Sequence, residues 1–207
     1  MEKPRVRQFL MVDGKNVTTE IIPDHEHEGI SDDDDEGCLD LFLKRFLEEG
    51  DMVVGFGTER SFANSEAQVS LLKLCTQVGC LLIKLGGVGG KNYFQLLRKM
   101  FANKDIVFAG VRIKRDLEKL EKCYGLEIRN AIDLCDVVEK TYGSRSTLNT
   151  CGVRDFIRFV WWKQFFPISM THIDYWGSET LTEDKKIECA TVDAYGIYRT
   201  AKILLKY

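Results

Sequence analysis

The 207-residue sequence lacks the features that define several large classes of protein. No apolar run approaches the ~18 residues of a membrane span, and the N-terminal segment MEKPRVRQF has no apolar signal core. The net charge is only −3, which argues against a protein that coats nucleic acid non-specifically. The seven cysteines include no CxxC pair and are odd in number, as is typical of reduced thiols. We therefore expect a protein of the cytoplasm or the nucleus with no membrane association.

Histidine is also scarce, with three residues in the chain. His172 has no local partners for a catalytic triad, so no serine or cysteine nucleophile is supported. A weak metal site at His25 and His27 is one interpretation, but their acidic segment offers no rigid scaffold, and we favour a solvated loop. The glycine-rich segment GGVGGKN at 86–92 lacks both the first glycine and the Ser or Thr of a phosphate-binding loop. It predicts a flexible connection between a strand and a helix.

The chain does contain enough apolar sequence, 44% of residues, to form a full core. Strand and helix periodicities predict an α/β fold with a mixed central sheet and flanking helices. We expect one domain over residues 1–207, with an acidic mobile loop at 24–37. Strands are expected at 7–22 (as a hairpin), 52–59, 67–75, 80–85, 106–113 and 127–134, and helices at 38–49, 93–101, 115–124, 133–142, 152–166 and 182–206.

Three carboxylates occur in separate and recognisable contexts. Glu59 ends the apolar strand of VVGFGTER, Asp116 lies where a strand gives way to a helix, and Asp193 lies inside the C-terminal helix. Taken singly, each suits an ordinary strand end, helix start or solvated helix face. However, the small apolar neighbours of Asp193 predict that it faces protein and needs a partner, such as a metal ion. Two divalent cations ~3.5–4 Å apart, held by carboxylates from different elements, hydrolyse phosphodiesters.

Several motifs in order carry a resemblance over nearly the whole chain: VVGFGTER, FAGVRIKRDLEKLEKCYGLEIRNAIDL, GVRDFIRFV and WGSETLTEDKKIECATVDAY. The sequence resembles the DEDD (DnaQ-like, ribonuclease H-like fold) 3'–5' exonucleases. Within them it is similar to the plant Werner-exonuclease-like branch, which includes the RISC-interacting clearing exoribonucleases. The resemblance implies that Glu59, Asp116 and Asp193 are catalytic and hold Mg²⁺ or Mn²⁺. It also implies single-stranded RNA or DNA 3' ends as substrate, a ring-like homo-oligomer and an Argonaute-type protein partner.

Two positions depart from the family pattern. Gly57 stands where the family has its first acid, which bridges both metals, and Cys189 stands where it has a tyrosine that orients the attacking water. Losing that hydroxyl alone typically costs about 10²–10⁴-fold in rate. Arg60 also replaces the usual tryptophan. The departures predict a degraded active site that holds one metal ion or none.

Two hypotheses therefore stay open. The first is a 3'–5' exonuclease that acts on single-stranded 3' ends, with RNA favoured over DNA. The second is a catalytically inactive member of the fold that binds RNA or partner proteins as a scaffold or regulator. Basic residues within the second motif are candidates for contacts to the nucleic-acid backbone, with a solvated helix face as the alternative. They are Arg112, Lys114, Arg115 and Lys119.

Overall fold

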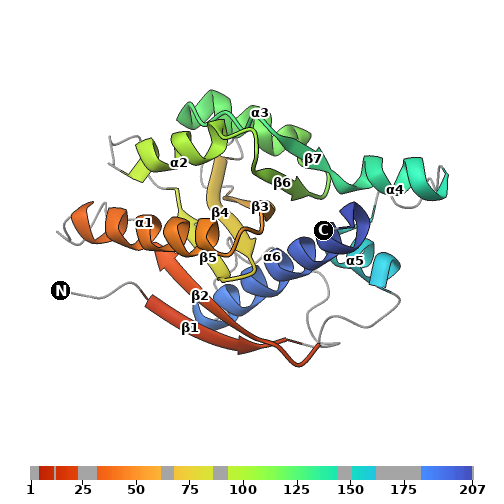
Figure 1. The fold of residues 1–207 in the computed structure, drawn as a ribbon, viewed down its shortest axis with the longest axis horizontal. Helices are drawn as coiled ribbons and strands as arrows, with labels where there is room; N and C mark the ends of the chain where they lie inside the picture. The colour runs from red at the N-terminus through yellow and green to blue at the C-terminus, as the bar shows by residue number, and fades with distance from the viewer. Residues whose placement is uncertain are drawn as a thin grey trace.

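The computed structural model describes residues 5–11, 13–22, 32–61, 68–85, 93–143, 151–161 and 183–206. These residues form a mixed sheet in the order β1-β2-β5-β4-β3-β6-β7, covered by helices (Figure 1). The strands are β1 (Arg5–Leu10), β2 (Asn16–Ile22), β3 (Val53–Ser61), β4 (Gln68–Thr76), β5 (Gly79–Lys84), β6 (Val107–Gly110) and β7 (Ala131–Asp133). The helices are α1 (Asp32–Glu48), α2 (Tyr93–Ala102), α3 (Lys114–Tyr124), α4 (Leu134–Tyr142), α5 (Val153–Trp161) and α6 (Glu183–Leu205).

The sheet combines antiparallel and parallel pairs, as the sequence predicted. β1 and β2 form the expected hairpin, and β3, β4 and β5 form an antiparallel meander. β2 pairs parallel to β5, and β6 runs parallel to both β3 and β7. Because β3 and β6 are neighbours that run in the same direction, their carboxyl ends lie on the same side of the sheet. Glu59 and the start of α3 lie there.

Successive side chains of β3 point to opposite faces of the sheet, and the core therefore has two layers. Val54 and Phe56 pack with α1, α2 and α3 on one face, where Phe42, Leu97 and Leu120 are fully buried. Val53 packs on the other face with residues of α4, α5 and α6. The long helix α6 crosses this second face and lies against the middle strands (Figure 1).

Gly55 sets how closely α6 approaches the sheet. A Cβ atom at this position would lie 2.6 Å from the backbone nitrogen and 2.7 Å from the Cβ of Tyr198. Real side chains do not come so close to backbone atoms, so only glycine lets the helix lie directly on β3. This contact fixes the height of α6 above the strand and therefore the position of Asp193.

Some expected boundaries differ from the structure by more than two residues. The strand expected over 127–134 spans only Ala131–Asp133. The acidic stretch expected as a loop over 24–37 is already helical from Asp32, because acidic residues suit the first turn of a helix. The strand expected to reach residue 113 ends at Gly110, because Arg112 takes a left-handed backbone conformation with φ 55°. Both Asp133 side-chain oxygens accept backbone hydrogen bonds in this turn, from Arg112 and Ile113 at 3.0 Å each.

Several expectations fall on residues outside those that the structure describes. They concern the glycine-rich segment 86–92, the three histidines, the end of the helix expected over 152–166 and the first residue of the helix expected over 182–206. In the described part of the chain, no helix is both long enough and apolar enough to cross a membrane.

Candidate functional site

The three predicted acids come from three elements that meet near the carboxyl ends of β3 and β6. Glu59 lies near the end of β3, beside an irregularity in its pairing with β4. Asp116 lies in the first turn of α3, which follows β6. Asp193 lies inside α6 and is 6% exposed. The predicted burial of Asp193 is confirmed, and its carboxylate must therefore have partners within the protein.

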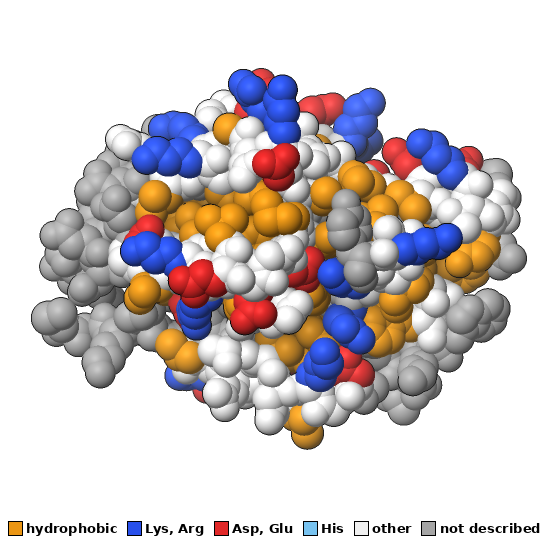
Figure 2. Space-filling view, in the orientation of Figure 1, with side chains coloured by type: hydrophobic (Ala, Val, Ile, Leu, Met, Phe, Trp, Pro, Cys, Tyr) orange, Lys and Arg blue, Asp and Glu red, His pale blue; other side chains and the backbone are white. Residues whose placement is uncertain are grey.

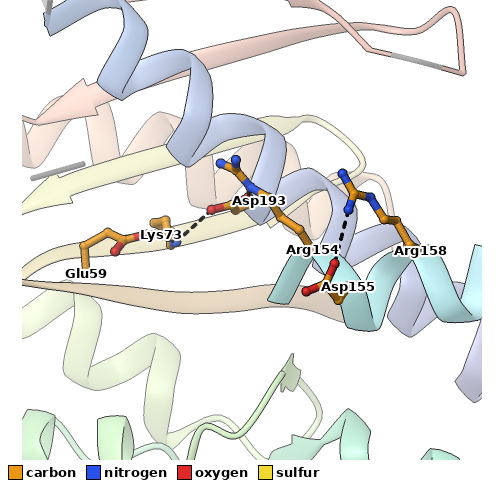
Figure 3. A network of polar contacts seen from close by, with 6 residues as sticks. All are labelled: Glu59, Lys73, Arg154, Asp155, Arg158 and Asp193. Atoms are coloured by element: carbon orange, nitrogen blue, oxygen red, sulfur yellow. Dashed lines mark hydrogen bonds and ion pairs between the residues drawn. The ribbon is translucent and has the colours of Figure 1, made fainter. Parts of the chain in front are cut away.

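Lys73 is the partner that sequence reasoning missed. It lies on β4 directly opposite Gly57 of β3, and its side chain is 4% exposed. Its Nζ atom lies 2.5 Å from Oε1 of Glu59 and 3.9 Å from Oδ2 of Asp193 (Figure 3). A Cβ atom at Gly57 would lie 3.2 Å from Lys73 Cε and 3.8 Å from Nζ. The ammonium group therefore fills the space beside position 57, between two of the acids.

The environment of Lys73 keeps it charged. Burial alone lowers the pKa of its ammonium group, but the nearby carboxylates of Glu59 and Asp193 more than offset this. The net effect is a pKa above the ordinary value for lysine. Lys73 is therefore a cation at neutral pH, held by the carboxylates around it.

The other two contacts involve arginines. Arg154, in the first turn of α5, donates from Nε to Oδ1 of Asp193 at 2.9 Å (Figure 3). Arg60, which follows Glu59 on β3, donates from Nη2 to Oδ1 of Asp116 at 2.6 Å. Each acid is thus bonded to a cationic side chain. Three carboxylates and three cations cancel in formal charge.

Cys189 lies one turn before Asp193 and is 1% exposed. Burial raises the pKa of its thiol, against the opposing influence of Arg154. A buried neutral thiol cannot serve as a nucleophile or replace a phenolic hydroxyl as a hydrogen-bond partner for water. Cys189 is a small core residue here.

This arrangement does not fit a divalent metal ion. An ammonium group beside position 57 would repel a second cation, and one oxygen of each carboxylate already accepts a bond from Lys73, Arg154 or Arg60. Among the described residues, no group of three or more His, Cys, Asp or Glu side chains is placed to hold a metal. Position 57 contributes no ligand, because it is glycine.

A groove of ≈ 630 Å³ opens beside Asp116 and carries most of the predicted basic residues. Arg112, Lys114 and Arg115 line it, whereas Lys119 is not among its lining residues. The turn held by Asp133 presents Arg112 at the rim. The face seen in Figure 2 intersperses Lys and Arg with Asp and Glu, without a broad field of one sign. This face therefore offers nucleic acid no extended basic surface.

The fold is that of the ribonuclease H-like exonuclease domains. RNase D of Escherichia coli superposes with a TM-score of 0.64 at 17% identity, over 82% of this chain and 42% of RNase D. The exonuclease domain of Aedes aegypti Nibbler gives a TM-score of 0.58 at 17% identity, over 81% of this chain and 84% of that domain. At such identities the likeness establishes the shared fold, as the sequence predicted.

Sequence comparison defines the family. The model of a 3'–5' exonuclease domain matches residues 34–206, and the chain belongs to this family. The Arabidopsis thaliana protein RISC-interacting clearing 3'–5' exoribonuclease 1 is 24% identical over 202 residues, 92% of each chain. The mouse bifunctional 3'–5' exonuclease/ATP-dependent helicase WRN is 29% identical over 153 residues, 72% of this chain. This chain spans only 10% of the length of the mouse protein.

Proposed function

We propose that this protein binds the 3' ends of single-stranded RNA without a metal ion and without hydrolysing them. The observation that carries the proposal is the position of Lys73. Its ammonium group lies between Glu59 and Asp193, beside the glycine that replaces the first acid of the family. A lysine supplies positive charge there, but it has no open coordination position. It cannot lower the pKa of a bound water as a metal ion does.

The charge balance supports binding in the absence of metal. In a two-metal centre, the cations neutralise the acids and let a phosphate approach. Here Lys73, Arg154 and Arg60 neutralise the same acids. A phosphodiester therefore meets no unbalanced carboxylate at these three acids. The adjoining groove is lined by four basic and three acidic side chains, so its net positive charge attracts the phosphodiester.

RNA is preferred over DNA on the basis of the Arabidopsis relative, an exoribonuclease by name that matches this chain along nearly its whole length. The ring-like homo-oligomer and the Argonaute-type partner stay predictions. So does a location in the cytoplasm or the nucleus.

Binding and hydrolysis can be tested in one experiment. Single-stranded RNA labelled at its 5' end is incubated with the protein in EDTA and, separately, in Mn²⁺. We expect equal fluorescence anisotropy in both buffers and intact RNA on a denaturing gel. The double variant Arg112→Gln, Arg115→Gln should bind more weakly, because both residues line the groove. The matched control Lys99→Gln, Lys104→Gln removes the same charge from exposed positions on α2 and the loop after it, outside the groove lining.

Two results would overturn the proposal. One is binding that requires Mn²⁺. The other is a ladder of products shortened from the 3' end that Asp193→Ala abolishes, since this would assign hydrolysis to the site itself. A ladder that persists in Asp193→Ala identifies a contaminating nuclease, and the assay is then repeated after further purification.

A further inference from the structure

A second polar pocket, of ≈ 280 Å³, lies on the side of α6 that faces away from Asp193. The helix contributes Tyr195, Tyr198, Arg199 and Lys202 to its wall. At about 100° per residue, these positions fall roughly 140–240° around the helix from Asp193. The remaining wall comes from Lys15 with the start of β2 and from the turn between β4 and β5 with its flanking residues. The pocket is therefore separate from the exonuclease-like site.

The charged side chains that line this pocket are all cationic. They are Lys15, Arg199 and Lys202, and none of the described lining residues is acidic. Two carboxylates that do not line the pocket contact two of these cations. Asp51 lies 3.0 Å from Nζ of Lys202, and Asp13 lies 3.6 Å from Nε of Arg199. Three cations against two carboxylates leave a net positive charge at the pocket.

The cations are held in place before any ligand arrives. Tyr198 donates to Asp51 at 2.6 Å, and Tyr195 donates to Asp13 at 2.8 Å, so both carboxylates are fixed to α6. The guanidinium of Arg199 lies over the ring of Trp161, with its Cζ atom 5.6 Å from the centroid. Its Nε atom is buried and has no hydrogen-bond partner among the described residues. An oriented guanidinium is suited to an anion that carries several oxygens.

We propose that this pocket binds a small phosphorylated ligand. Arg199 and Lys15 contact its phosphate, and the side-chain amides of Asn16 and Gln77 contact the rest of it. The volume lies just below the range of typical small-molecule sites, about 300–1,000 Å³, so the ligand is small. This proposal does not depend on RNA binding at the other side of α6.

Isothermal titration calorimetry with inorganic phosphate, at constant ionic strength, tests the site. We expect one phosphate per chain. Lys15→Gln should weaken binding by about fivefold or more, and Arg199→Gln by at least as much. Lys15 is an exposed turn residue, so its variant tests the site even if Arg199→Gln disturbs the packing on Trp161.

The groove variant Arg112→Gln, Arg115→Gln serves as the control and should bind phosphate as the parent protein does. The proposal is overturned by an absence of binding in the parent protein. It is also overturned if the groove variant loses binding while the Lys15 and Arg199 variants retain it. That second result would assign the phosphate to the exonuclease-like site.

Discussion

Gly57 and Lys73 face each other across β3 and β4, and the lysine side chain extends over the glycine toward Glu59. At the position where the family resemblance predicts a metal-binding acid, the chain thus has glycine, and a buried ammonium group lies beside it. The two changes belong together, because the ammonium compensates the carboxylates that a metal would otherwise neutralise. Most of the predictions below follow from this pair.

Removing Lys73 should destabilise the protein strongly. Lys73→Met leaves Glu59 and the buried Asp193 without their shared cation, and breaking a buried ion pair in this way costs about 3–5 kcal/mol. Lys84→Met is the matched control, because Lys84 pairs with Glu183 at 2.7 Å but is 29% exposed. That pair should be worth about 1 kcal/mol or less. Urea denaturation measures both, and equal losses would contradict the role of Lys73.

Restoring the family residues at Gly57 and Cys189 alone should not restore metal binding. In Gly57→Asp, Cys189→Tyr, the new carboxylate lies beside the Lys73 ammonium and forms an ion pair with it. Adding Lys73→Ser removes this competing cation and leaves clustered acids that need one. Calorimetry with Mn²⁺ should show binding only in the triple variant. Binding of Mn²⁺ by the double variant would show that Lys73 does not block the site.

Divalent metal should leave the stability of the natural sequence unchanged. A ligand present at 100 times its dissociation constant stabilises a protein by about 2.7 kcal/mol, which raises the melting temperature by several degrees. Thermal unfolding in EDTA and in millimolar Mn²⁺ should give the same midpoint here. The triple variant described above provides the positive control, since Mn²⁺ should raise its midpoint. A clear rise in the natural sequence would contradict the metal-free site.

The salt dependence of RNA binding should identify the groove residues as phosphate contacts. Each contact to a single strand contributes about 0.7 to the slope of log K against log salt concentration. Arg112→Gln, Arg115→Gln should therefore reduce the slope by about 1.4. The control Lys99→Gln, Lys104→Gln should keep the original slope. If the groove variant binds more weakly with an unchanged slope, the arginines act through structure and not through phosphate.

Cys135 should react slowly with thiol reagents although it lines the groove. Burial, followed by the charge of Asp133, raises the pKa of its thiol to about 12. A raised pKa lowers the thiolate fraction, to about one in ten thousand at pH 8. Cys123 is exposed and should be labelled first. Mass spectrometry after timed exposure to iodoacetamide gives the order, and early labelling of Cys135 would contradict this environment.

The fold could be predicted because local patterns and tertiary packing agree. The apolar run before Glu59 forms β3, and α3 ends at Tyr124, as the sequence indicated; Gly125 follows in a left-handed conformation. The site could not be predicted to the same extent. Lys73 stands in the apolar run VSLLKLC, and a lysine there signals a buried partner. Which acid it contacts depends on the register between β3 and β4, and that register includes an irregularity at Glu59 that no local pattern reveals.

The antiparallel pairing of position 57 with position 73 also constrains the order in which substitutions at these two positions can occur. Aspartate can appear at position 57 first, because Lys73 is there to neutralise it and the flexible lysine end can give way. Loss of Lys73 first would leave Glu59 without its cation and Asp193 with Arg154 alone. We therefore expect a substitution to aspartate at position 57 to be tolerated before a loss of Lys73 is.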